Sequence, residues 1–531
     1  MPNTQNSTDA IIIGGGHNGL VCAYYLASKG LKVNIFERRP IIGGAAVTEE
    51  FHPGFKNSVA SYTVSLLNPE IIKEMKLKEY GLKIVKRPIS NFLPIDDKTY
   101  LKLGGGLERT QEEFKKFSEK DAAKLPEYYD RIEAVADVLR DISVKTPPNP
   151  KKGIKAVLGA ALQLWPIATK GNQVHRDVYD LFTKSARSFL DSWFENEHIK
   201  AAFGFDSTVG NFASPDTPGS AYVLLHHVFG EIDGEKGVWG HAIGGMGSIT
   251  QAMEKACKNM GVKIFTDAPV NKVIVKDNAA VGIELEDGSS IVANKIISNL
   301  NPKLLYKKLI SEDELEPEFN RGMDGYKCGS GTFRMNVALA ELPDFSVLPG
   351  KEVGEHHQSG IVIAPTLDYM DKAYIDAKSQ GWSSAPIVEM LIPSTIDNTL
   401  APDGKHVASL FCQQFSPTMP DGSSWHDHRL AAADTIIETV TKHAPNFRES
   451  ILGMMILSPL DLEEKFGLIG GDIMHGQMSL DQMWAARPLM NFGDYRGPLK
   501  SLYMCGSGTH PGGGVTGLPG KNAAREILKD V

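Results

Sequence analysis

The sequence predicts an α/β fold in which a Rossmann-like nucleotide-binding domain is built from separate segments and interleaved with an α+β domain. Three observations support this prediction. A strand, a glycine-rich loop, a helix and a second strand follow one another within residues 9–37, which is the order of a nucleotide-binding βαβ unit. A glycine-rich turn, a helix and a strand occupy 240–265, and a third glycine-rich loop links a strand to a helix within 501–531.

The bulk composition excludes several classes of protein. With 531 residues, the chain is longer than a single core needs. The hydrophobic fraction of 42% and the charged fraction of 23% are typical of globular proteins. The 56 Lys and Arg residues against 64 Asp and Glu residues give a net charge of −8, with no basic stripe. We therefore expect no nucleic-acid partner; the oligomeric state stays open.

The cysteines and the N-terminus indicate a reducing environment. The five cysteines are scattered, with no Cys-x-x-Cys pair and no Cys/His cluster at zinc spacing. We expect neither a disulfide framework nor a metal site. Residues 1–9 lack Lys, Arg and an apolar core, so they resemble neither a signal peptide nor a transit peptide. The expected location is cytoplasmic.

The first motif predicts dinucleotide binding. The pattern Gly14-x-Gly16-x-x-Gly19 opens the helix expected at 20–29, and Glu37 ends the second strand 18 residues after Gly19. These glycines allow a tight turn and a close approach of the backbone to a pyrophosphate, and the acidic residue accepts hydrogen bonds from ribose hydroxyls. The alternative is a glycine-rich turn that binds nothing.

A glycine pair follows the acidic residue. Glu37 and Arg38 are followed shortly by Gly43-Gly44, an arrangement typical of flavoproteins of the two-dinucleotide-binding-domain type. The commonest form of that motif has Arg after the glycine pair, whereas this chain has Ala45. An ordinary Gly-Gly turn is the alternative interpretation.

The C-terminal loop carries the most glycines. Its sequence, from Gly506 to Gly517, contains a second formal Gly-x-Gly-x-x-Gly pattern at 512–517. Too few residues follow it for another strand and an acidic partner, so we expect no second dinucleotide unit here. We expect instead a helix N-terminus aimed at a flavin, where backbone N–H groups favour negative charge.

These segments together resemble the phytoene desaturase family of FAD oxidoreductases. The likeness rests on 14–45, 240–247 and 508–515 and runs nearly end to end. It implies a discontinuous FAD-binding domain and redox chemistry on an apolar substrate in an interleaved substrate domain. The expected FAD-binding segments are 1–70, 235–305 and 480–531, and the expected substrate-domain segments are 71–234 and 306–479.

The motifs and the resemblance predict the FAD contacts. The backbone of Val270 is expected to lie against the adenine. The expected cofactor-binding residues are Gly14, Gly16, His17, Asn18, Gly19, Glu37, Arg38, Gly43, Gly44, Ala45, Val270, Gly506, Gly508, Val515 and Thr516.

The implied reaction needs few acid–base groups. A flavin dehydrogenase passes hydride to N5, and a base takes only the neighbouring proton. His510 and His241 lie in motif loops and are the candidate bases; alternatively, each imidazole hydrogen-bonds only to loop backbone. We expect dehydrogenation or isomerisation of a hydrophobic polyene or lipid-like substrate. An amine oxidase, or a flavin-loaded regulatory or interaction protein with little turnover, is the alternative.

A second feature lies within the expected substrate-domain segment 71–234. Residues 154–167 are largely apolar, and Lys151, Lys152, Lys155 and Lys170 flank or interrupt them. The segment is too short to span a bilayer. It predicts a helix in peripheral contact with the inner face of a membrane, and a buried core helix with snorkelling lysines is the alternative.

Overall fold

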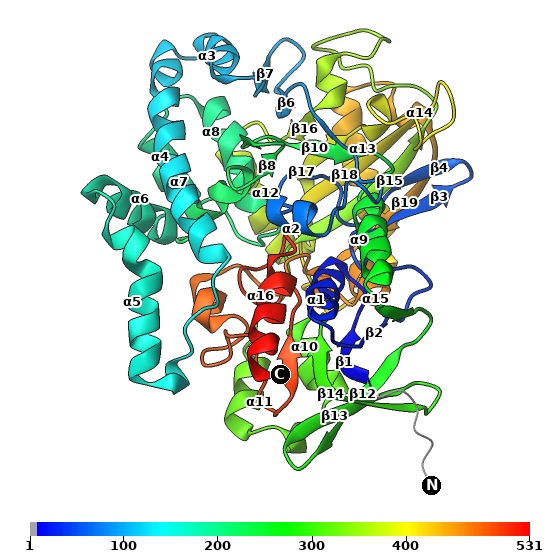
Figure 1. The fold of residues 1–531 in the computed structure, drawn as a ribbon. Coiled ribbons are helices and arrows are strands. Elements are labelled where there is room, and N and C mark those ends of the chain that lie inside the picture. The colour runs from blue at the N-terminus through cyan, green and yellow to red at the C-terminus, as the bar shows by residue number, and fades with distance from the viewer. Residues whose placement is uncertain (1–7) are drawn as a thin grey trace.

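The structure is a computed structural model that describes residues 8–531, apart from the side chains of Lys152, Pro166, His226 and His227. Residues 1–7, where we expect the FAD-binding domain to begin, lie outside the described residues. Two large sheets organise the chain, with a mainly helical region beside the second sheet (Figure 1).

The first sheet has a parallel core. Its order is β11-β2-β1-β14-β13-β12, with β20 beside β14. Strands β11, β2, β1, β14 and β20 pair in parallel, and β12 and β13 extend the sheet with antiparallel pairing. Their bounds are β1 Thr8–Ile13, β2 Val33–Phe36, β11 Lys263–Phe265, β12 Val270–Lys276, β13 Ala279–Leu285, β14 Ser290–Ser298 and β20 Leu502–Met504. The predicted α/β class is confirmed.

Three helices cover one face of this sheet. They are α1 His17–Ala27, α9 Gly247–Asn259 and α16 Leu518–Ile527. Their apolar residues form one buried cluster with β1 and β2, and Figure 1 shows the three helices side by side although the sequence separates them widely. The other face packs against α10 Pro302–Leu304, α11 Pro317–Asp324 and the residues between them, including the buried Tyr306 and Phe319.

The second sheet is almost entirely antiparallel. Its order is β19-β15-β18-β17-β16-β6-β7, and only β16 and β6 pair in parallel. The strands are β6 Asn91–Pro94, β7 Tyr100–Leu103, β15 Thr332–Leu339, β16 Gly360–Ile363, β17 Trp382–Leu391, β18 His406–Phe415 and β19 Ile451–Leu457. Helices α12 Leu367–Gln380, α13 Trp425–His443, α14 Phe447–Ser450 and α15 Pro459–Phe466 accompany them.

Short elements connect the two sheets, and six helices make up the helical region. The short elements are β3 Thr48–His52, β4 Phe55–Ser58, α2 Pro69–Glu74, β5 Ile84–Lys86, β8 Glu231–Ile232, β9 Glu235–Lys236 and β10 Gly240–Ala242. The six helices are α3 Leu107–Lys115, α4 Glu119–Ser143, α5 Ile154–Ala168, α6 Asn172–Thr183, α7 Ala186–Asp191 and α8 Glu197–Gly204.

Helix α4 corrects one expectation. The pair Leu125-Pro126 predicts a break, yet α4 runs through Pro126 without interruption. Proline has no N–H to donate to the carbonyl of Ala122 one turn earlier. The Gln111 side chain of α3 donates a hydrogen bond of 2.9 Å to that carbonyl instead. A side chain from a neighbouring helix thus replaces the lost backbone donor.

Helix α5 forms as expected over the segment 154–168, at one edge of the molecule (Figure 1). Most of its large apolar side chains are exposed, so the alternative of a buried core helix is wrong. Among the described residues, no helix is both long and apolar enough to cross a membrane.

Candidate active site

A cavity of about 530 Å³ lies where the two sheets meet. Ile13 and Phe36, the last residues of β1 and β2, line it at one end, and Glu389 of β17 and Phe411 of β18 line it at the other. Ligands of parallel α/β sheets bind beyond the carboxyl ends of the strands. The cavity therefore begins at the expected nucleotide site and continues to the wall formed by the second sheet.

Two glycine loops meet at the nucleotide end. The Gly43 amide donates a 3.0 Å hydrogen bond to the carbonyl of Gly15, and Gly14, Gly43 and Gly44 have φ values of +94°, +130° and +59°, a region that favours glycine. A Cβ on Gly16 would lie 2.7 Å from the Asn299 amide nitrogen. The loops can pack this closely because the glycines carry no side chain.

Glu37 is held in place by the same loop. Its Oε2 accepts a 2.8 Å hydrogen bond from the Gly15 amide, and its Oε1 accepts one of 3.0 Å from the Arg39 amide. The carboxylate is buried and lines the cavity. Because each carboxylate oxygen accepts more than one hydrogen bond, Glu37 retains the capacity to bind ribose hydroxyls.

The predicted cofactor-binding residues divide into two groups. Those that line the cavity are Gly14, Gly16, His17, Asn18, Glu37, Arg38, Gly44, Ala45, Val270 and Val515. Those behind it are Gly19, Gly43, Gly506, Gly508 and Thr516. The second group shapes the loops: a Cβ on Gly19 would lie 2.5 Å from the Gly14 carbonyl oxygen, and one on Gly506 would lie 2.7 Å from the Asn299 carbonyl oxygen.

Buried polar atoms at the nucleotide end have no partner among the described residues. They include His17 Nε2, Asn18 Oδ1 and His475 Nδ1, and all three residues line the cavity. Burial lowers the pKa of His17 to about 4 and that of His475 to about 3, so both imidazoles are neutral at pH 7. Buried polar groups are normally hydrogen-bonded. The phosphate and ribose oxygens and the ring nitrogens of FAD offer the missing partners, so these residues fit that cofactor.

Neither candidate base lines the cavity. Both are buried. The His241 Nε2 lies 2.8 Å from the Asp397 Oδ2, and the His510 Nε2 lies 3.1 Å from the carbonyl oxygen of Ile142. The positions of these imidazoles therefore do not favour a proton transfer with a molecule in the cavity, and the two roles stay predictions.

Asp397 connects the His241 strand to the second sheet. Burial acts to raise its pKa, but hydrogen bonds from His241, Thr399 and the Gly244 amide lower it to about 2. Its Oδ2 accepts from the Gly244 amide at 2.7 Å and its Oδ1 from the Thr399 hydroxyl at 2.6 Å. The ionised carboxylate thus fastens the glycine turn at 244 to the loop that follows β17.

The sequence motifs miss the polar group at the other end of the cavity. The Tyr62 hydroxyl donates a hydrogen bond to the Glu389 Oε2, and the Tyr62 ring stacks on Phe411 with centroids 4.9 Å apart. All three residues line the cavity. Burial, followed by the Glu389 charge, raises the pKa of Tyr62 well above its ordinary value, so the phenol keeps its proton.

Arg334 packs against the Tyr62 ring of this group. Its guanidinium carbon lies 4.6 Å from the centre of the Tyr62 ring, and its Nη2 donates a 2.8 Å hydrogen bond to the Ser409 hydroxyl. One feature of the sequence could have indicated the Tyr62–Glu389 pair. Glu389 is a single charge within the apolar run from Ile387 to Ile392, and such a residue is seldom buried without a purpose.

Comparison with known proteins identifies the family. Residues 19–332 match the profile described as flavin containing amine oxidoreductase. Pyridine nucleotide-disulfide oxidoreductase domain-containing protein 2 of Rattus norvegicus is 39% identical, over 98% of this chain and 94% of the relative. The chain belongs to the flavin containing amine oxidoreductase family. It is accordingly a FAD-binding oxidoreductase, as the motifs predict.

More distant relatives of this FAD-binding oxidoreductase include the enzymes that the sequence resembles. The lycopene-forming phytoene desaturase of Pantoea ananas is 23% identical, over 98% of this chain and 99% of the relative. A solved structure of a putrescine oxidase triple mutant superimposes with a TM-score of 0.60 at 16% identity, covering 99% of each chain. At that identity the likeness shows the fold alone.

Proposed function

We propose that this FAD-binding oxidoreductase dehydrogenates or isomerises a hydrophobic, polyene-like or lipid-like substrate. One observation carries the proposal: a single cavity continues from the glycine loops to a wall of the second sheet. FAD, when bound, supplies the hydride acceptor for such a reaction. The phytoene desaturase relative acts, by its name, on an apolar chain, which agrees with this substrate class.

The side chains beyond the nucleotide end are suited to an apolar molecule. Those that line this part are Leu66, Val209, Trp239, Phe411, Leu468, Ile473 and Met474. They come from both domains and bury apolar surface of whatever they enclose. Ligand sites commonly combine such a lining with a few polar groups that fix orientation.

Glu389 is the proposed proton acceptor. Tyr62 holds its Oε2, and among the described residues no hydrogen bond to its Oε1 is found. In a dehydrogenation, bound FAD would supply the hydride acceptor for one substrate C–H bond. Glu389 would take the proton from the neighbouring C–H bond as the C=C bond forms between the two carbons. A fixed carboxylate with a free oxygen is suited to that step.

The same pair also favours a second candidate function. A carboxylate beside the stacked rings of Tyr62 and Phe411 is suited to an alkylammonium group, which aromatic faces and anions both attract. An amine oxidation would use this end of the cavity to orient the substrate nitrogen. The matched family has amine oxidoreductase in its description.

Anaerobic bleaching of the flavin absorbance tests both functions. The FAD-loaded protein would be mixed in separate experiments with a carotenoid, a terpenoid hydrocarbon, a long acyl chain and a diamine. We expect an apolar substrate to bleach the flavin. Bleaching by the diamine alone would assign the protein to amine oxidation. If dithionite bleaches the flavin but no substrate does, the protein is a flavin-loaded regulator, and the proposal fails.

A further inference from the structure

Helix α5 exposes its large apolar side chains and turns its small residues toward the protein. A helix packed on a core normally does the reverse. The large apolar side chains, which we call the outer face of α5, point away from the protein. They are Ile154, Val157, Leu158, Leu162, Leu164 and Trp165, and Ile154 and Leu162 are 77% and 74% exposed. Their spacing of three and four residues places them on one side of the helix. In a globular protein whose surface meets only water, a surface helix normally turns such an apolar face toward the core.

The opposite side of α5 carries small residues and faces the protein. Ala156 is buried, and Gly159, Ala160 and Gln163 are partly buried. The Gln163 amide donates a hydrogen bond to the Thr146 carbonyl, and His175 of α6 contacts the Ile167 carbonyl at 2.6 Å. These two hydrogen bonds therefore hold the C-terminal half of the helix in the orientation that exposes the large side chains.

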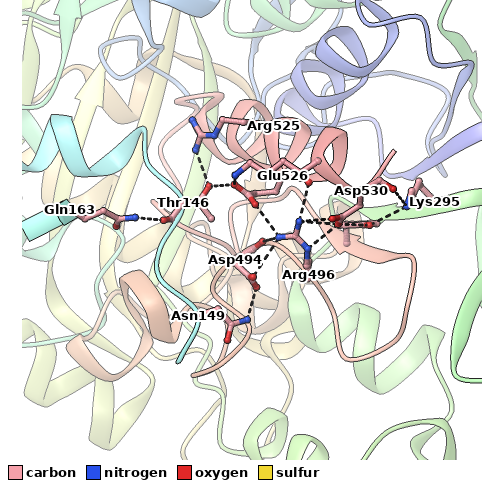
Figure 2. A network of polar contacts seen from close by, with 11 residues as sticks. Thr146, Asn149, Gln163, Lys295, Asp494, Arg496, Arg525, Glu526 and Asp530 are labelled. Carbon is pink, nitrogen blue, oxygen red and sulfur yellow. Dashed lines mark hydrogen bonds and ion pairs between the residues drawn. The ribbon is translucent and has the colours of Figure 1, made fainter. Parts of the chain in front are cut away.

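A polar network fixes the segment that leads into α5 (Figure 2). The Thr146 hydroxyl donates a 2.6 Å hydrogen bond to Glu526 of α16, and the Asn149 amide donates one of 3.0 Å to Asp494. Glu526 is in turn paired with Arg496 at 3.0 Å. Figure 2 shows these residues joined in one continuous set of contacts, which reaches α5 at Gln163. Exposure of the outer face is thus a built feature of the fold.

The charged residues of the segment that contains α5 are all positive. Residues 142–176 contain no Asp or Glu, although the whole chain has a net charge of −8. The basic residues of this stretch are Lys145, Lys151, Lys152, Lys155, Lys170 and Arg176. Lys155 and Lys170 are exposed near the two ends of α5. An apolar face bordered by cations complements a surface that is apolar within and anionic at its edge.

We propose that α5 is an interfacial anchor that lies in the surface of a lipid bilayer containing anionic headgroups. The outer face inserts among the acyl chains, and the lysines contact the phosphates. The 15-residue helix is about 22 Å long, which suits a helix parallel to the membrane plane. A second copy of the chain is disfavoured as the occupant, because two identical positive segments would repel each other across a symmetric contact.

Co-sedimentation with vesicles tests this proposal on the FAD-loaded, full-length protein. One set of vesicles is phosphatidylcholine, and the other contains roughly one third phosphatidylglycerol. We expect binding to the anionic vesicles that weakens with salt. The variant I154S/L158S/L162S should bind at least about tenfold more weakly, and replacing Lys151, Lys155 and Lys170 by Gln should remove the preference for anionic lipid.

A matched variant controls for the loss of exposed apolar surface. V292S/I375S/L430S removes three similarly exposed aliphatic side chains from β14, α12 and α13, and it should bind like the wild type. Unchanged flavin absorbance and melting temperature show that the variants fold, and neither readout depends on the reaction catalysed. Wild type that stays unbound, or I154S/L158S/L162S that binds normally, would overturn the proposal. So would a wild-type dimer that this variant dissociates, which would assign the face to a second copy.

Discussion

The Tyr62 hydroxyl donates a hydrogen bond to the Glu389 carboxylate and so joins two segments that are more than three hundred residues apart in the sequence. Tyr62 follows the hairpin of β3 and β4, whereas Glu389 lies in β17 of the second sheet. Both residues line the cavity that the glycine loops also line.

Replacing Glu389 by Gln should slow flavin reduction by the substrate about a hundredfold or more, because the amide cannot accept the departing proton. Single-turnover reduction under anaerobic conditions measures this rate. The FAD content should stay unchanged, since Glu389 belongs to β17 of the second sheet and to none of the glycine loops. Glu113→Gln, which alters a partly buried carboxylate of α3 outside the cavity, is the control. Equal rates for wild type and Glu389→Gln would exclude the proposed role.

Replacing Gly19 by Ala should weaken FAD binding. The new Cβ would lie 2.5 Å from the Gly14 carbonyl oxygen, so the loop must shift. Overpacking of this kind costs about 1–3 kcal/mol, which corresponds to roughly a tenfold to hundredfold loss of affinity. Titration of the apoprotein with FAD measures it. Gly171→Ala adds a Cβ where nothing lies within 4 Å and should bind FAD normally; an equal loss in both variants would contradict the steric cause.

Replacing Asp397 by Asn should destabilise the protein by about 2 kcal/mol at pH 7. The folded state lowers the pKa of this carboxyl from 3.8 to about 2, so the charged form stabilises the fold. That contribution is complete above pH 4 and is lost as the pH falls from about 4 to 2. Denaturant unfolding should therefore show a difference between wild type and variant that shrinks below pH 4. Asp421→Asn, at an exposed turn, should change the stability little at pH 7.

Acid should destabilise the protein partly through His510. Burial lowers its pKa from 6.5 to about 4, so the imidazole binds a proton on unfolding when the pH lies between these values. Stability is therefore lost as the pH falls below 6.5, by about 2 kcal/mol at pH 5 for this group. His510→Gln should have a flatter dependence of the melting temperature on pH between 6.5 and 4. A slope identical to that of the wild type would show that His510 does not titrate this way.

Local sequence was sufficient for the nucleotide-binding unit. The glycines from Gly14 to Gly19, the acidic Glu37 and the pair Gly43-Gly44 predicted the turn, a helix after it and the cofactor. The helix begins at His17, three residues before the expected start at Leu20. Each of these features depends on backbone conformation or on neighbours within about forty residues. By contrast, α4 continues through Pro126 because Gln111 of another helix replaces the missing donor, which no local pattern reveals.

The sequence by itself determined the fold class, the FAD cofactor and a short apolar helix bordered by lysines, because periodicity, glycine spacing and charge are properties of the chain. Only the tertiary structure decided which titratable groups reach the cavity. His241 and His510 lie in glycine-rich motif loops but turn to Asp397 and to the Ile142 carbonyl. Tyr62 and Glu389 belong to no motif and meet at the cavity because a loop and a central strand pack together. Side-chain direction in a buried site depends on contacts between distant segments, and those contacts form only when the sheets assemble.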